Sequence, residues 1–420
     1  MRVTKRGVLR GLLVVVLAAL VANFALLWLA NRSLARAVAE APGLRTRLVE
    51  FVPPEMPKAE NASSYLNAAG ELCSLSQDEM RLTARRRGTA RSAAPPALPL
   101  GAWRDIVRRN ELALRILDAA ADLQKAWFEA DYSVPNPNDV RIPPLLQRRH
   151  LASVLRVRAL LAADEGRGDD AYRDVLFMLR MSDWCSQESP TLISALISVA
   201  IAGIAVDTLE DAMSLVGPGP ELRSALEQRL SERRRADPIR RGLEGEVAWQ
   251  TGVFEDLVAG RVEPGATGLP YLMDVLAPRF YLRLNQAASL RATTALIQRA
   301  DRTTADLKRS NESNGPKIPF WAVITRIALP SLNRALYSRD ELRARLDLGR
   351  LALAAEDWRS AHGGYPSGSP ESWSTSDRVD PITGAPYSYD PQPGGFSLRG
   401  QPGRYPALAF VVTTNAAAPK

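Results

Sequence analysis

Cysteine and histidine are scarce in this chain of 420 residues, which contains two of each. Neither Cys73 and Cys185 nor His150 and His362 have the spacing of zinc ligands, so we predict no metal site. The two cysteines either form one disulfide in an oxidising compartment or stay as two separately buried thiols. His150 is expected to be a solvated or core-edge residue of a basic helix, and His362 is expected to cap a helix end.

Motifs for catalysis and nucleotide binding are absent as well. The chain lacks a Gly-x-Ser-x-Gly elbow, a phosphate-binding loop, a His-Glu-x-x-His pair and a dinucleotide-binding fingerprint. The sequence therefore names no catalytic residue and no cofactor. Carboxylates are the only groups numerous enough for acid–base chemistry.

One group of carboxylates lies on a single predicted helix around Trp249. Glu244 and Glu255 are eleven residues apart, which is close to three helical turns, so they share a face. Two acids beside an aromatic residue are what a glycosidase-like site requires. The alternative is that these acids are ion-pair partners of nearby arginines. The acids are Glu244, Glu246, Glu255 and Asp256, and the arginines are Arg240, Arg241 and Arg261.

Neither sign of charge is in large excess, with 54 basic residues, 46 acidic residues and a net charge of +8. The basic clusters are short, at residues 85–87 in a Pro/Ala-rich loop and at residues 233–235 after an amphipathic helix. We expect both clusters to be solvated surface, and we expect no nucleic-acid partner. Attraction to anionic lipid headgroups is the better functional alternative.

One long hydrophobic run is present near the N-terminus. Residues 11–30 contain no charge and follow a basic tail at residues 1–10. As a helix this run spans about 30 Å, the thickness of the hydrocarbon core of a bilayer. The apolar core of a secretory signal peptide is shorter, about 7–15 residues. The run also ends on bulky residues, with Trp28 near the headgroup boundary, so we interpret it as an uncleaved transmembrane helix.

The charges that flank this run predict its orientation. Basic residues lie on both sides, and the short tail holds its charges close to the span. We therefore expect a single-pass protein of the bacterial inner membrane, with residues 1–10 in the cytoplasm and the C-terminal part in the periplasm. Its first partner is then membrane lipid.

A second uncharged stretch covers residues 189–206. Its small residues permit tight helix packing, and it continues with helical spacing into the acidic residues Asp207, Glu210 and Asp211. We interpret it as a central buried helix, because a helix that is apolar all round is typical of a domain core. The alternative is a second span, which would return the rest of the chain to the cytoplasm.

Residues 61–338 are predicted to form an irregular α-helical domain, joined to the span by a linker or helical extension at residues 31–60. Two helices at residues 145–165 and 169–185 flank the turn Gly166-Arg167-Gly168. This hairpin resembles a tetratricopeptide repeat, although no second copy follows at a fixed period. The alternative is an isolated αα-hairpin. The other expected helices cover residues 63–75, 103–132, 220–235, 238–259, 272–307 and 319–336.

Residues 339–420 are predicted to form a small α+β segment. A helix that starts at Asp340 is expected to end at Gly363-Gly364, before Tyr365-Pro366. Two short strands follow around a turn at residues 390–395, and residues 408–414 are expected to add a third. The order of helix corner, Asp-Pro-x-Gly-x-Pro-Tyr turn and Gly-Phe-x-Leu strand resembles the globular part of the major pseudopilins of type II secretion systems.

This resemblance implies a small α+β fold and names no activity. The chain departs from the family at two points. Leu12 stands where a prepilin has a Glu, and Gly400–Arg404 has no acidic calcium-binding loop. We therefore expect neither a pilus subunit nor a calcium ligand. The whole arrangement resembles bacterial envelope proteins with one N-terminal anchor, a helical domain and a pseudopilin-like tail.

The sequence favours a membrane-anchored protein without enzymatic activity that binds a protein partner in the envelope. Binding is expected through grooves of the helical hairpin and through the aromatic residues Tyr365, Tyr387 and Tyr389. The alternative for these tyrosines is packing inside the small domain. Two other functions stay open: an envelope hydrolase that acts on glycans through helix-borne carboxylates, and an accessory subunit of a secretion or pilus-like machine.

Overall fold

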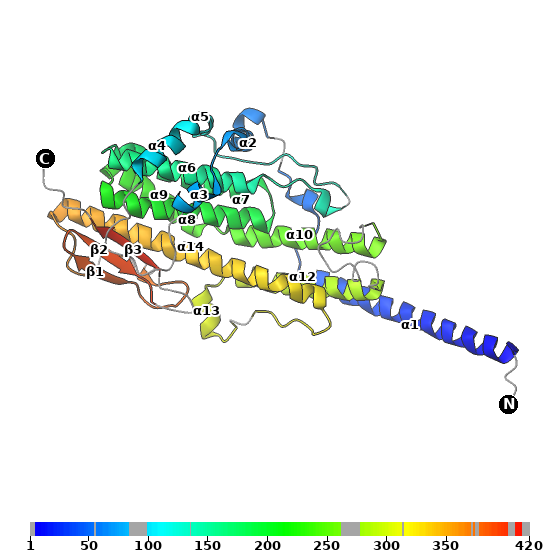
Figure 1. The fold of residues 1–420 in the computed structure, drawn as a ribbon. Helices are drawn as coiled ribbons and strands as arrows, with labels where there is room; N and C mark the ends of the chain where they lie inside the picture. The colour runs from blue at the N-terminus through cyan, green and yellow to red at the C-terminus, as the bar shows by residue number, and fades with distance from the viewer. Residues whose placement is uncertain are drawn as a thin grey trace.

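The computed structural model describes residues 5–53, 56–83, 99–134, 136–261, 278–312, 315–370, 373, 378–401 and 408–413. Over these residues the chain is mainly α-helical with one small antiparallel sheet, as predicted (Figure 1). The first helices are α1 (Lys5–Ala39), α2 (Ala62–Leu72), α3 (Gln77–Thr83), α4 (Leu100–Arg109), α5 (Glu111–Ala119), α6 (Leu145–Asp164) and α7 (Gly168–Glu188). The later ones are α8 (Leu192–Leu215), α9 (Pro220–Arg235), α10 (Pro238–Ala259), α12 (Arg279–Arg299), α13 (Thr304–Arg309) and α14 (Val323–His362).

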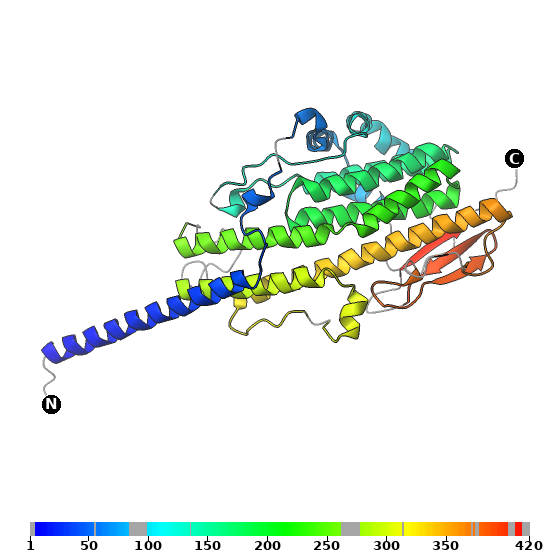
Figure 2. The same ribbon diagram turned by 180° about the vertical axis from the view of Figure 1, so that it is seen from behind.

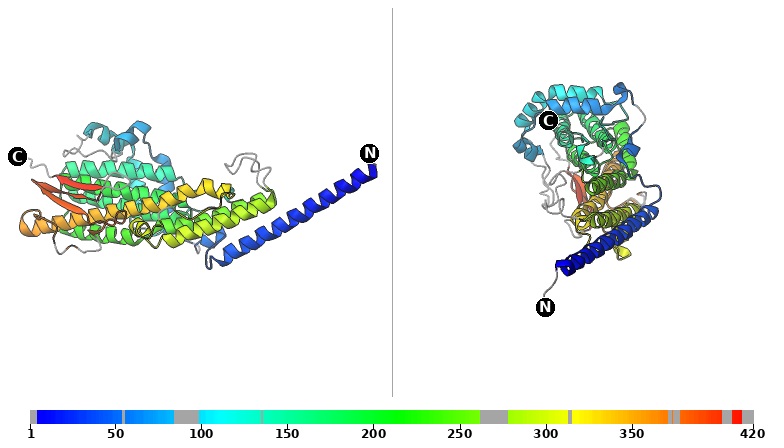
Figure 3. Two further views of the ribbon diagram at one scale, coloured as in Figure 1. Left: turned by 90° about the horizontal axis from the view of Figure 1, so that it is seen from below. Right: turned by 90° about the vertical axis from the view of Figure 1, so that its right-hand side faces the viewer.

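Helix α1 projects from the rest of the molecule as a straight apolar rod (Figures 1 and 3). It is long and apolar enough to cross a membrane, and only 6% of its most apolar window is buried. Large apolar side chains from Leu13 to Leu29 are exposed on it. Length and composition alone are shared by transmembrane helices and signal sequences. The contacts that α1 makes with the rest of the protein after Leu27 are therefore needed to distinguish an anchor from a signal sequence.

Helix α8 is the second helix that is long and apolar enough to span a membrane, but 61% of its most apolar window is buried. It packs against α6, α7, α10 and α14. Its N-cap is Thr191, whose side chain accepts a hydrogen bond from the Ser194 amide. On its buried face the Ser198 carbonyl accepts a hydrogen bond of 2.8 Å from the Ser182 hydroxyl on α7. The predicted central buried helix is confirmed, and it continues to Leu215.

The predicted helical hairpin is formed by α6 and α7. Gly166 has a φ of 77°, the left-handed conformation that lets the chain turn between the helices. The small residues Ala159, Ala162, Ala163 and Ala171 are buried at this hairpin. Helices α2, α3 and α4 cover the other side of α6 (Figure 1). These helices therefore enclose the hairpin on that side.

The helix predicted over residues 103–132 is wrong in its extent. The structure has two helices there, α4 and α5, and the chain runs in non-helical conformation from residue 120 to 134. Asn110 separates the helices, because its side-chain amide donates to the Ile106 and Ser74 carbonyls, at 2.8 and 3.0 Å. Such side-chain bonds compete with the helical ladder. Further on, the Phe128 amide donates to the Glu188 carbonyl, which ties this extended segment to the end of α7.

A second correction concerns α14, which starts at Val323 and continues to His362 without interruption. The sequence suggested one helix ending near residue 336 and another starting at Asp340, so the expected boundary between residues 338 and 339 lies inside this helix. Asp340 is not an N-cap. Its carboxylate is buried, pairs with Arg339 at 2.9 Å, and accepts a hydrogen bond from the Thr304 amide at 2.7 Å.

The three strands follow the order β1-β2-β3, with β1 (Ser388–Gln392), β2 (Gly395–Arg399) and β3 (Ala409–Thr413). Pro393 and Gly394 connect β1 to β2, and Gly394 has the left-handed φ of 74° that a two-residue turn needs. Strands β2 and β3 pack on α14, and β3 also contacts α8. The helix that carries the sheet ends as predicted, with Gly363 as its left-handed C-cap at a φ of 76°.

Some predictions fall outside the described residues. These are the basic cluster at residues 85–87 and the first part of the helix expected at residues 272–307. The rest of that run forms α12 and α13, separated by the Thr303 capping box. Cys73 and Cys185 are both free thiols. Helices α9 and α10 have the expected bounds.

Candidate functional site

The junction between α1 and α12 joins the apolar rod to the helical body (Figure 2). Leu27, Ala30, Leu34 and Ala37 lie three or four residues apart, which places them on one face of α1. Ala30 and Ala37 are 0% and 1% exposed, while most of their neighbours on α1 are exposed. This spacing is that of a coiled-coil seam, and its alanines permit close approach of the two helices. The last turns of α1 are therefore an integral part of the fold.

Arg291 on α12 holds the end of α1 in register. Its guanidinium donates to the Ser33 carbonyl at 3.0 Å and to the Ser33 hydroxyl at 3.2 Å, and it pairs with Glu40 at 2.9 Å. The pair is partly exposed, so its own contribution is modest, about 0.2–1 kcal/mol. The apolar seam supplies most of the stability of the junction, and Arg291 fixes its alignment.

The boundary of the apolar rod carries an aromatic and a basic side chain. Trp28 is 54% exposed, and the Arg32 guanidinium lies 5.4 Å from the centroid of its ring. An indole prefers the headgroup region of a bilayer, and an arginine one turn further from the core extends toward the polar side. This pair therefore marks the level at which a membrane surface would cross α1.

The carboxylates on α10 are ion-paired or hydrogen-bonded. Glu244 pairs with Arg240 at 3.3 Å, and Asp256 pairs with Arg261. These are two of the three arginines expected from the sequence. Glu255 pairs instead with Arg283 on α12, which lowers the pKa of Glu255 against the opposing effect of burial.

Glu246 is the exception among these acids, because it has no cationic partner within the described residues. It accepts a hydrogen bond of 3.0 Å from the Gln250 amide. Burial raises its pKa, and the Gln250 bond offsets part of that increase. The Gln250 carbonyl oxygen in turn accepts from the Ser289 hydroxyl on α12. This chain of polar groups ties α10 to α12 and leaves no free acid for proton transfer.

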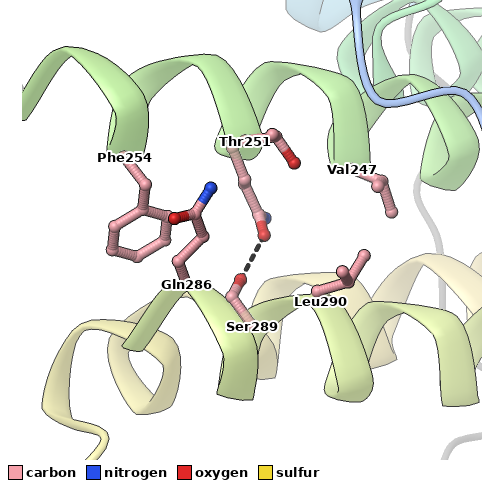
Figure 4. A pocket seen from close by; sticks show the side chains of 7 residues that line it. Val247, Thr251, Phe254, Gln286, Ser289 and Leu290 are labelled. Carbon is pink, nitrogen blue, oxygen red and sulfur yellow. Dashed lines mark hydrogen bonds between the residues drawn. The ribbon is translucent and has the colours of Figure 1, made fainter. Parts of the chain in front are cut away.

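A small hollow lies between α10 and α12 (Figure 4). A glycosidase needs two carboxylates on either side of a sugar ring. The hollow has no carboxylate in its lining, and the Ser289–Gln250 bond crosses it. It therefore lacks the groups for the glycan chemistry that the sequence left open. The lining residues are Val247, Gln250, Thr251, Phe254, Gln286, Ser289 and Leu290.

The histidines and cysteines lie far from any shared centre. His362 in the last turn of α14 stacks on Trp358, and its Nδ1 donates to the Trp358 carbonyl at 3.0 Å, in keeping with the expected capping role. His150 is half-buried, and burial lowers its pKa. Burial raises the pKa of Cys73 to about 11 and also raises that of Cys185, so neither is a reactive thiolate. Among the described residues, no group of three or more His, Cys, Asp or Glu side chains is placed to hold a metal.

The three tyrosines of the tail differ in burial, because Tyr365 and Tyr389 are half-buried and Tyr387 is buried. Tyr387 is only 8% exposed. Tyr365 packs edge-on against Phe396 and donates a hydrogen bond to Glu356, and Tyr389 stacks on Phe396 and donates to the Pro366 carbonyl at 3.0 Å. Tyr387 therefore packs inside the small domain, as in the alternative weighed from the sequence, while Tyr365 and Tyr389 keep part of their surface exposed.

Buried charges fasten the tail to the helical body. Asp347 on α14, with a fully buried side chain, pairs with Arg234 on α9, and Arg345 pairs with Asp207 on α8 at 3.0 Å. The Glu210 carboxylate on α8 accepts a hydrogen bond of 2.8 Å from the Val411 amide in β3. The basic cluster at residues 233–235 is therefore not a solvated patch. Arg233 is 2% exposed and donates to the Ser198 hydroxyl at 2.6 Å.

Sequence reasoning missed two features of the junction. The first is the seam on α1, whose signal is the spacing of Leu27, Ala30, Leu34 and Ala37 across the expected end of the span. The second is an exposed apolar segment around Phe320, just before α14. Its signal is the Pro319-Phe320-Trp321 triplet ahead of a helix, which the sequence interpretation assigned to an ordinary helix start.

Comparison of the chain with models of known protein families, with curated proteins and with solved structures gives no match.

Proposed function

We propose that this protein is held in the bacterial inner membrane by α1, with residues 1–10 in the cytoplasm and the helical body in the periplasm, and that it acts there by binding a protein partner. The observation that carries the proposal is the continuity of α1. One helix contains the apolar run and the seam on α12. A span built in this way sets the position of the whole body relative to the lipid surface.

The same continuity favours an anchor over a cleaved signal sequence. The small-residue triplets that follow the apolar run, around Ala35 and Ala37, are helical, and Ala37 is buried at the seam. Proteolysis is concentrated where backbone is exposed and free of regular structure. Cleavage after Ala37 would also remove the side chains that cover α12. The folded body is therefore best accounted for with α1 attached.

The tail supports a second candidate, an accessory subunit of a secretion or pilus-like machine. Its helix α14 ends at the Gly363 cap, the chain turns through Tyr365 and Pro366, and an antiparallel sheet packs back on the helix. A long helix carrying such a sheet fits the pseudopilin-like arrangement proposed from the sequence. The tetratricopeptide-like character of the α6–α7 hairpin is less useful for binding, because α2, α3 and α4 cover it.

Glycan hydrolysis has the least support. Glu244 and Glu255, the proposed pair, are both engaged by arginines, and the hollow beside them has no acidic lining. Double substitution of Glu244 and Glu255 by glutamine should therefore leave any activity of the envelope fraction on glycans unchanged.

The proposal is tested by cross-linking in intact cells, followed by affinity purification of the full chain from gently solubilised membranes. The matched control replaces residues 1–26 with an unrelated apolar segment and keeps the seam from Leu27 onward. A partner of the body should be recovered from both chains in a fixed ratio. Recovery of no such protein contradicts the interaction, and recovery of secretion components favours the second candidate.

Topology is tested separately with trypsin added to spheroplasts. The body should be digested from outside in intact spheroplasts, while a tag before residue 1 stays protected until the membrane is permeabilised. Protection of the body would contradict the periplasmic placement.

A further inference from the structure

An exposed apolar edge lies at the start of α14. Phe320 and Ile327 are 82% and 59% exposed, and Trp321 and Ile324 between them are half-buried. Ile324 and Ile327 are three residues apart and so share one side of the first turns of α14, and Phe320 and Trp321 lie in the turn just before this helix. We call Phe320, Trp321, Ile324 and Ile327 the apolar edge. Large side chains exposed together in this way mark a surface that meets a non-aqueous partner.

Hydrogen bonds place this edge near the membrane boundary of α1. The Thr325 hydroxyl donates to the Asn285 carbonyl on α12 at 3.2 Å, and Arg291 on the same helix contacts Ser33 of α1. Helices α1 and α12 run side by side in the same direction (Figures 2 and 3). Asn285 lies six residues before Arg291, about 9 Å along the axis.

On α1, Leu27 likewise lies six residues before Ser33, the residue that Arg291 contacts. Thr325, and with it the apolar edge, is therefore level with Leu27 and its neighbour Trp28. That is the level at which the Trp28–Arg32 pair places the lipid surface.

Basic side chains flank the apolar edge. Lys317 and Arg326 are exposed, and neither forms an ion pair with a described residue. The Arg326 guanidinium donates to the Phe320 carbonyl at 3.4 Å. Aromatic and aliphatic side chains beside free cations are the composition of a segment that lies in the headgroup region of an anionic bilayer. The level shared with Trp28 is what favours lipid over a soluble protein partner.

We propose that the apolar edge inserts into the headgroup region of the bilayer beside α1, with Lys317 and Arg326 on anionic lipid. The inference rests on the proposed anchoring by α1 and adds a second point of contact. One helix alone leaves the body free to tilt and rotate about the span. Two contacts at the same level fix which face of the body points away from the lipid, and so which face meets a partner.

The experiment uses the full chain in vesicles of phosphatidylcholine with about one third phosphatidylglycerol. An environment-sensitive fluorophore is attached to a new cysteine at Phe320→Cys, and quenching by nitroxide-labelled lipids is measured. The native Cys185 is fully buried, whereas Cys73 is half-buried, so all labelled chains also carry Cys73→Ser. Ala361→Cys is the matched control, because it is exposed at the far end of the same helix, α14. Leu20→Cys reports the span itself.

The probe at position 320 should be quenched by shallow nitroxides at least about twofold more than the probe at 361. Quenching at position 20 by deep nitroxides together with none at 320 overturns this inference and leaves the anchor intact. Absence of quenching at position 20 overturns the anchor itself.

A second measurement separates insertion from mere proximity. With the fluorophore at Lys317→Cys, the double change Phe320→Ser and Ile327→Ser should remove the shallow quenching. Both side chains are exposed, so the fold has little to lose from these changes. In an otherwise unchanged chain labelled at position 320, Arg326→Gln should make quenching more sensitive to salt, because fewer cations hold the edge on anionic lipid. Unchanged quenching in the serine variant contradicts a role for the apolar side chains.

Discussion

Helices α1 and α8 have nearly the same apolar composition and opposite environments. Both are long enough to cross a bilayer, yet 6% of the most apolar window of α1 is buried and 61% of that of α8. The difference lies in what each helix can contact. Serines and a glutamate on α8 form hydrogen bonds with α7 and β3, whereas the described apolar run of α1 before Leu27 has only exposed side chains.

The comparison shows that average hydropathy does not identify a span in this chain. A helix that is apolar all round is stable either in lipid or in a protein core, and the neighbouring helices decide which. Helix α8 has four helices around it. Over the described residues the main neighbour of α1 is α12, and the two helices meet at the seam and at the Arg291 contacts. A substitution or deletion in one of these helices, or among its neighbours, should therefore leave the other helix unaltered.

The largest effect is expected from removal of residues 1–26, which leaves the seam from Leu27 onward in place. Without the apolar run the body should move from the membrane pellet to the soluble fraction after a carbonate wash, while its far-ultraviolet circular dichroism stays helical. The corresponding deletion within α8, residues 192–206, should abolish the folded body, because it removes the centre of the core. A chain that stays with the membrane after the first deletion would show that α1 is not its main attachment.

The second largest effect is expected from a single new carboxylate, which should have different consequences in α8 and in α1. Ala202 on α8 is 0% exposed, so Ala202→Asp places an unpaired carboxylate in the core and should cost more than about 4 kcal/mol. Leu20→Asp on α1 should leave the melting of the body unchanged and disfavour membrane insertion by about 2.5–3.5 kcal/mol. Thermal melting and fractionation of both variants test this contrast. Equal loss of folding would contradict it.

The third largest effect is expected from breaking a buried ion pair near α8. Arg148 and Glu188 have fully buried side chains 2.8 Å apart, and Glu188 also accepts from the Ser63 hydroxyl at 2.6 Å. Glu188→Gln leaves the Arg148 charge uncompensated and should destabilise the body by about 3–5 kcal/mol. Urea unfolding in detergent measures this change.

The control for that pair is Arg115→Ala, which breaks an exposed ion pair with Glu111. It should change stability by less than about 1 kcal/mol. Similar losses of stability in both variants would mean that burial of Arg148 does not determine how much its ion pair contributes to stability.

A smaller effect is expected where α8 holds the sheet. Glu210→Ala removes the acceptor of the Val411 amide and should cost about 1–3 kcal/mol, with faster hydrogen exchange at that amide. Glu210→Gln is the matched variant, because its amide oxygen still accepts the bond. Exchange that is equally fast in both variants would show that the carboxylate charge, not the acceptor, matters.

The smallest effect depends on pH. Because burial raises the pKa of Glu246 in the folded chain, the ionised form is favoured in the unfolded chain, and this residue lowers stability as pH rises above the ordinary glutamate pKa. Glu246→Gln should therefore stabilise the protein at neutral pH. This gain in stability should vanish as the pH falls to about 4 and below, where glutamate becomes protonated in both the folded and the unfolded chain. Melting curves across this range test the sign, and a gain that grows on acidification would contradict it.

Local patterns predicted much of the fold. The bounds of α9 and α10 follow from Pro220 and Pro238 at their first positions, and the end of α14 follows from Gly363. These features depend on backbone conformation, which neighbouring residues determine. The turn at Gly166 and the three strands of the tail were predictable for the same reason.

Features that depend on distant partners were not predictable. Asn110 breaks a helix because its side chain reaches Ser74, and Asp340 lies inside a helix because Thr304 and Arg339 satisfy it. Tyr387 is buried among residues of the core that lie far from it in the chain. The candidate site also contains features of both kinds, those set by neighbouring residues and those set by distant partners. The apolar run was visible in the sequence, whereas its seam on α12 and the apolar edge beside it required the fold.

The central claim is that α1 stays joined to the body as its membrane anchor. Its most direct test is the intact mass of the protein purified from carbonate-washed membranes. The account predicts one species that retains residues 11–39. A mature chain that begins between residues 30 and 40 would contradict it, because the apolar run would then be a discarded leader.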